Sequence, residues 1–128
     1  MPTSRSGAVV TNLRRICLAF PGAAEKPFGG HVSPAFRVRD KLFCTLSEDG
    51  SYVTLKAGPG DQALLAASDP ERFFVPPYVG AKGWVGVRMH GAVDWEEVAE
   101  LAEDSYRLIA PRSLVTELDE GPGRGLPV

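Results

Sequence analysis

The sequence contains few cysteines and no long apolar run. Only two cysteines, Cys17 and Cys44, occur among its 128 residues, and each lies in an apolar pattern rather than in a spaced pair. We therefore expect two buried thiols in a reducing compartment, with a disulfide between them as the less favoured alternative. No segment approaches the roughly 18 apolar residues that span a bilayer, and no unbroken apolar stretch follows residues 1–7. The sequence thus predicts a cytoplasmic protein without a membrane anchor or a signal peptide.

The common signatures of metal and catalytic sites are also missing. The two histidines, His31 and His90, lie neither in H-E-x-x-H nor near a cysteine pair, and no serine occupies G-x-S-x-G. The segment 80–83 has glycines and a lysine, but the full phosphate-loop spacing is absent. We expect no metal, no cofactor and no enzymatic activity. The remaining alternative is an enzyme of unrecognised type, in which His31 or His90 would titrate abnormally in a cleft.

The sequence has no excess of positive charge. Its 14 basic and 16 acidic residues give a formal net charge of −2. Strong general affinity for nucleic acid depends on neutralising phosphates, so this balance does not favour it. A local basic patch is still compatible with the sequence.

The hydrophobic pattern predicts a group of strands flanked by helices. Helices are predicted at 9–20, 61–67, 95–109 and 114–118, and strands at 35–38, 42–46, 51–56 and 84–89, with a short fifth strand at 73–75. Asp94 and Glu97 form a capping-box pattern at the start of the third helix. Clustered strands favour an α+β fold with a mainly antiparallel sheet of about five strands and helices packed on one face. We expect one domain over residues 1–118 and a flexible tail over residues 119–128.

The strands also predict the character of the sheet face opposite the helices. Alternation in residues 84–90 places valines and a methionine toward the core and other residues outward. The outward face would collect Arg37, Arg39, Trp84, Arg88 and His90. Such a face could stack a nucleobase and bind phosphates, although exposed arginines also commonly just solvate a sheet. A two-residue turn would place Leu42, Cys44 and Leu46 there too, which indicates that the face is partly covered.

Several ordered segments resemble the MmcQ/YjbR family of small bacterial proteins. The resemblance covers about residues 9–118, and it rests on RICLAFPGA at 15–23, FRVRDKLF at 36–43, VTLK at 53–56, PPYVGAKGWVGV at 76–87, VDW at 93–95 and SYRLIAP at 105–111. Phe28 stands near where the family typically has tryptophan. The resemblance implies a fold similar to that of bacterial frataxin and a family label of DNA binding. It implies no catalytic residues, and fold similarity alone does not transfer function.

Two functions follow as hypotheses. The first is a small, non-enzymatic DNA-binding protein that uses a hairpin and sheet surface, with electrostatic contacts from Arg37, Arg39, Lys41, Lys56, Lys82 and Arg88. The second is a small-ligand or protein-interaction module with a pocket around Tyr78, Lys82 and Trp84, because Pro76, Pro77 and Tyr78 can wall such a pocket. Tyr78 and Trp84 would supply stacking or packing in either case.

Overall fold

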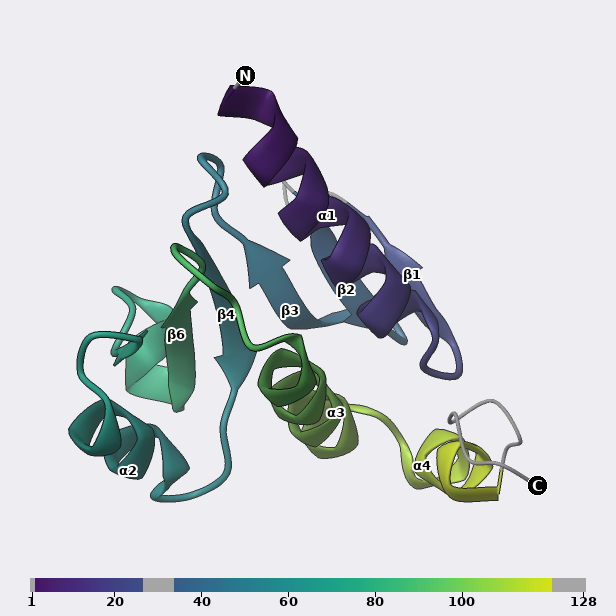
Figure 1. The fold of residues 1–128 in the computed structure, drawn as a ribbon. Helices are drawn as coiled ribbons and strands as arrows, with labels where there is room; N and C mark the ends of the chain where they lie inside the picture. The colour runs from purple at the N-terminus through teal and green to yellow at the C-terminus, as the bar shows by residue number, and fades with distance from the viewer. Residues whose placement is uncertain (1, 27–33, 121–128) are drawn as a thin grey trace.

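The computed structural model of the chain describes residues 2–26 and 34–120 (Figure 1). Along the chain the elements are α1 (Pro2–Leu18), β1 (Ala23–Glu25), β2 (Ala35–Val38), β3 (Lys41–Leu46), β4 (Tyr52–Lys56), α2 (Asp61–Ser68), β5 (Phe73–Phe74), the 3-10 helix η1 (Val79–Lys82), β6 (Trp84–Arg88), α3 (Trp95–Ile109) and α4 (Arg112–Glu120). This arrangement confirms the predicted α+β class. Residues 121–128 of the expected tail, together with Phe28 and His31, lie outside the described residues.

The six strands form one antiparallel sheet in the order β1-β2-β3-β4-β6-β5. Five of them lie where the sequence pattern places strands. The additional strand is β1, which pairs with β2 through Ala23 opposite Val38. Its three residues, Ala-Ala-Glu, have low β propensity, so pairing with a neighbouring strand rather than local preference makes this segment extended.

Helices α1 and α3 contact each other and cover one face of the sheet (Figure 1). Helix α3 buries Val98, Ala102, Ser105 and Tyr106 along one stripe. Its first turn is capped as predicted, because the Asp94 carboxylate accepts a hydrogen bond of 3.1 Å from the Glu97 backbone N–H. The core lies between these helices and the sheet, and no helix in the described part of the chain is long and apolar enough to cross a membrane.

A β-bulge in β3 corrects one expectation about the faces of the sheet. Phe36 pairs with Cys44, but Arg37 pairs with Leu42, so Phe43 is an extra residue. Beyond the bulge the side chains change sides, and Cys44 and Leu46 are buried in the core rather than beside the arginines. Of the three apolar residues expected on the arginine side, Leu42 is the one that register places opposite Arg37. A simple two-residue turn without a bulge could not produce this division.

Helix α2 packs differently from the other helices. It contacts β5 and β6, yet none of its residues is buried, and Leu64 is 68% exposed. Gln62 holds the helix in place through its side-chain amide, which donates to the Gly80 carbonyl at 2.8 Å and to the Trp84 carbonyl at 2.6 Å. Leu65 of this helix packs against the core, and Gln62 ties the helix to η1 and β6 through two hydrogen bonds.

Candidate functional site

The sheet face opposite α1 and α3 carries a row of small and hydroxyl residues. Register places Ala35, Thr45, Thr54 and Gly86 side by side across β2, β3, β4 and β6. The Thr45 and Thr54 hydroxyls hydrogen-bond to each other, and Thr54 is buried. Small side chains in the middle of a face leave space above the sheet. Here the space above Ala35, Thr45 and Thr54 is a hollow.

The hollow has a volume of about 890 Å³ and a predominantly apolar lining. Its floor comes from β2, β3, β4 and β6, and its rims come from the β3–β4 turn and from the segment before β6. The lining residues are Pro34, Ala35, Leu42, Thr45, Leu46, Ser47, Glu48, Asp49, Tyr52, Thr54, Pro76, Pro77, Tyr78, Val79, Lys82 and Trp84. A cavity of this size with an apolar lining and a few polar groups is typical of small-molecule sites.

One rim is a backbone turn in a sparsely populated conformation. Tyr78 has φ 65° and ψ −71°, and the Val79 N–H donates to the Pro77 carbonyl at 2.7 Å. This is the positive-φ γ-turn, which is rare and strained for a residue with a side chain. It leaves Tyr78 93% exposed. The rim therefore presents an aromatic side chain to solvent at a cost in backbone energy.

The structure around the turn is tightly packed and holds it in place. Pro76 is buried, and its carbonyl accepts a hydrogen bond of 3.0 Å from the Gly80 N–H. A Cβ on Gly80 would lie 2.5 Å from Val75 Cγ1, so any larger residue there would force the Val75 side chain to move. The Lys56 ammonium donates to the Lys82 carbonyl at the other end of η1. These contacts fix both ends of the segment that forms the rim.

The charges at the two ends of the hollow have opposite sign. Lys82 lies exposed on the rim formed by η1, whereas Glu48 and Asp49 lie in the β3–β4 turn. Hydrogen bonds from the Ser51 hydroxyl and N–H and from the Ser47 hydroxyl lower the pKa of the Asp49 carboxyl. The turn is therefore anionic at neutral pH.

An aromatic cluster borders the hollow beside Tyr52. The Phe74 ring lies over Gly86, where a Cβ would come within 2.7 Å of three ring atoms. The Tyr52 and Phe74 rings pack edge to face with centroids 5.1 Å apart, and the Arg88 guanidinium lies 4.4 Å from the Phe74 centroid. Gly86 thus lets the outer end of an aromatic ring come close to β6.

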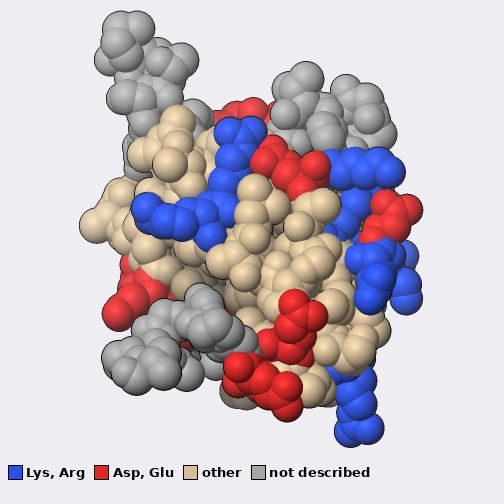
Figure 2. Space-filling view, turned by 90° about the vertical axis from the view of Figure 1, so that its right-hand side faces the viewer, with Lys and Arg blue, Asp and Glu red and all other residues tan. Residues whose placement is uncertain are grey.

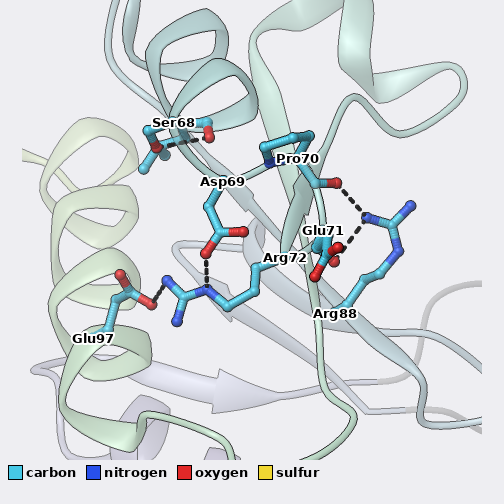
Figure 3. Close-up of polar contacts among 8 residues, drawn as sticks. Ser68, Asp69, Pro70, Glu71, Arg72, Arg88 and Glu97 are labelled. Atoms are coloured by element: carbon cyan, nitrogen blue, oxygen red, sulfur yellow. Dashed lines mark hydrogen bonds and ion pairs between the residues drawn. The ribbon is translucent and has the colours of Figure 1, made fainter.

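Arg88 is held by contacts within the protein. Its guanidinium donates to the Pro70 and Glu71 carbonyls, both at 3.3 Å (Figure 3). Its neighbour Arg72 lies between Asp69 and Glu97 in the same view and forms ion pairs with both. Arginine side chains engaged in this way have fewer donors left for a phosphate.

The structure divides the sequence-predicted site residues into two groups. Tyr78, Lys82 and Trp84 line the hollow, and register places Lys56 opposite Trp84. Trp84 is 9% exposed, so most of its surface is already packed. The other residues, Arg37, Arg39, Lys41 and Arg88, are absent from the lining of the hollow.

The β2–β3 hairpin carries three of these basic residues. Arg37 donates to the Asp40 carbonyl at 3.1 Å, and its Nε is buried with no hydrogen-bond partner among residues 2–26 and 34–120. Arg39 and Lys41 are exposed around a turn in which Arg39 has φ 51° and Asp40 has φ 66°. On the side of the molecule shown in Figure 2, blue and red side chains are interspersed, so the basic groups visible there form no continuous field.

Sequence reasoning did not single out Tyr52, Thr45 and Thr54 as site residues. The alternation in residues 52–56 could have indicated two of them. Tyr52, Thr54 and Lys56 would share one face of a strand. The apolar residues between them indicate which face is the core. His90 is exposed beyond β6, and no group of three or more metal-ligating side chains occurs among residues 2–26 and 34–120.

Comparison with known proteins places this arrangement in a family. A search of curated proteins found no match. Among solved structures, the crystal structure of the Deinococcus radiodurans protein DR2400, which carries a DUF419 domain, is similar with a TM-score of 0.73 and 24% identity, over 88% of this chain and 92% of that chain. That likeness supports the fold. The family model described as YjbR matches residues 18–108. Because this match spans more than half of the chain, the protein belongs to the YjbR family.

Proposed function

We propose that this protein is a small-ligand-binding protein and that the hollow on the helix-free face of the sheet is its binding site. The observation that carries the proposal is the strained, exposed Tyr78 at the rim of a predominantly apolar hollow. Backbone strain persists only where the surroundings enforce it, and it is concentrated at functional sites. A merely structural bend would gain nothing from exposing an aromatic ring.

The composition of the hollow supports the same function. Tyr52, Tyr78 and Trp84 provide aromatic surface, and prolines form part of the rim. The Thr45 and Thr54 hydroxyls and the Lys82 ammonium are among the polar groups that could orient a ligand.

A ligand screen by NMR tests this proposal. We expect hits to shift the amide resonances of residues 76–84 and of β4, because these segments line the hollow, while resonances of α1 stay unchanged. Tyr78→Ala should weaken the hits, whereas Leu64→Ala, which removes another exposed apolar side chain outside the hollow, should not. Hits that shift resonances elsewhere, or that ignore Tyr78→Ala, would refute the assignment of the site.

DNA binding is the second candidate, and the exposed Arg39 and Lys41 at the tip of the hairpin favour it. Anisotropy titration with single- and double-stranded DNA at low and at physiological salt tests this candidate. Phosphate binding should weaken steeply with salt and should be lost when Arg39 and Lys41 are both replaced by alanine. Arg88→Ala is a poorer test, because it also removes the contacts with Pro70, Glu71 and Phe74 and so lowers stability. Absence of saturable binding at low salt would exclude DNA as the partner.

A further inference from the structure

The charge distribution of the hollow distinguishes its two ends. The Lys82 side chain is exposed at one end and forms no ion pair within the described part of the chain. At the other end, Asp49 accepts hydrogen bonds from Ser47 and Ser51 and remains anionic. An anionic group on a ligand would be attracted to Lys82 and repelled by the β3–β4 turn. The hollow therefore favours one orientation of a singly charged anion.

The length of β4 sets the size of a matching ligand. Tyr52 lies next to the acidic turn, and Lys56 pairs with Trp84 near Lys82. At about 3.3 Å per residue, the four steps from Tyr52 to Lys56 span roughly 13 Å. A single aromatic ring would leave much of this length empty. A system of two or three rings matches it.

The surface between the two ends favours a flat ligand. Aromatic side chains lie at both ends of the hollow, Tyr52 at one and Trp84 with Tyr78 at the other. The middle of the floor is formed by Thr45 and Thr54, whose hydroxyls hydrogen-bond to each other. A planar ring system gains contact with such walls at little conformational entropy cost, unlike a flexible chain.

We infer that the hollow binds a flat aromatic monoanion of two or three rings, with its rings against the sheet and its anionic group at the Lys82 ammonium. This inference rests on the proposed function and adds the chemical class of the ligand. Lys56 supports the arrangement, because its ammonium fixes the Lys82 carbonyl and adds positive charge at the same end.

A matched pair of fluorescent probes tests the role of charge. Anilinonaphthalene sulfonate is an aromatic anion, and phenylnaphthylamine has the same ring system without the sulfonate. We expect the sulfonate to bind about fivefold more tightly, as an exposed ion pair of about 1 kcal/mol would give. Lys82→Gln should remove this preference and leave the affinity of the neutral probe within about twofold. Lys41→Gln makes the same charge change outside the hollow and should preserve the preference.

A displacement experiment tests the flat shape of the ligand. Naphthoate and undecanoate have the same number of carbon atoms and one carboxylate each, but only naphthoate is planar. We expect naphthoate to displace the neutral probe at lower concentration. Displacement by undecanoate at equal or lower concentration would overturn the aromatic class.

The outcomes separate this inference from the proposed function. If the neutral probe binds in a manner that depends on Tyr78 but the sulfonate binds no better, the hollow is a binding site and the anionic class is wrong. The same conclusion follows if Lys82→Gln and Lys41→Gln have equal effects. If neither probe binds saturably to the folded protein, the proposed function fails as well. Melting curves of each variant show that the protein tested is folded.

Discussion

Replacing Gly86 by alanine should destabilise the protein, although alanine is ordinarily the better residue in a strand. A Cβ at this position would lie within 2.7 Å of three atoms of the Phe74 ring. The ring would have to move by roughly 1 Å to restore an ordinary contact near 3.5 Å. Two neighbours oppose this movement. The Tyr52 ring centroid lies 5.1 Å from the Phe74 ring centroid, and the Arg88 guanidinium carbon lies 4.4 Å from it.

The two opposing effects can be compared in size. Alanine loses less backbone entropy on folding than glycine does, which favours alanine by about 0.5–1 kcal/mol. Overpacking of a rigid site typically costs about 1–3 kcal/mol, so the net loss should be about 1–2 kcal/mol. For a chain of this length, that loss lowers the melting temperature by roughly 4–8 °C. Overpacking therefore outweighs the gain in backbone rigidity.

Thermal unfolding followed by circular dichroism measures this effect, and Gly7→Ala is the control. Gly7 lies in α1 with no atom within 4 Å of its added Cβ, so alanine should be neutral or slightly stabilising there. Combining Gly86→Ala with Phe74→Ala should cost less than the sum of the two single changes, because the clash disappears. A Gly86→Ala melting temperature equal to that of the unmodified protein would refute the reasoning from the Phe74 ring.

Three further predictions concern buried groups and pH. Ser105→Ala should lower the free energy of unfolding by about 2–4 kcal/mol, as measured by urea unfolding. The buried Ser105 hydroxyl donates to the Phe43 carbonyl and accepts from the Lys56 N–H, and both groups would lose this partner. The Asp49 pKa is lowered in the folded protein, so its contribution to stability is present above the unfolded pKa near 3.9 and is lost as the pH falls through the folded value. Asp49→Asn should accordingly reduce the acid sensitivity of unfolding, and an unchanged pH profile would contradict this. Burial raises the pKa of the Cys17 thiol, so a thiol reagent should label Cys17 in the folded protein only at the rate of unfolding. Faster labelling under native conditions would show that the core around Cys17 opens.

The sequence predicts most of the fold because its local signals agree with the tertiary structure. The Asp94 capping pattern and the apolar stripe that follows it correctly locate α3. Strand β1 has no such signal, since alanine and glutamate have little β propensity and pairing with β2 determines it. The bulge at Phe43 could not be predicted either, because it depends on how β2 and β3 fit together over the core.

The candidate site is predictable in outline only. The prolines and glycines around Tyr78 indicate a shaped rim, and Tyr78, Lys82 and Trp84 do meet at one hollow. The γ-turn that exposes Tyr78 results from packing of Pro76 and Gly80, which local preference cannot specify. Similarly, alternation places Arg88 on the helix-free face of the sheet, but it does not reveal that the Arg88 guanidinium donates to two backbone carbonyls.

The weak packing of α2 has a consequence for the dynamics of the protein. A helix with no fully buried residue loses fewer core contacts on local opening than α3 does, so its amides should exchange with solvent much faster than those of α3. Each opening that releases Gln62 also removes a hydrogen-bond donor from the Gly80 and Trp84 carbonyls, which belong to the rim and to β6. Local opening of α2 and loosening of the rim are thus coupled events. A ligand that orders the rim would slow hydrogen exchange in a helix that it does not touch.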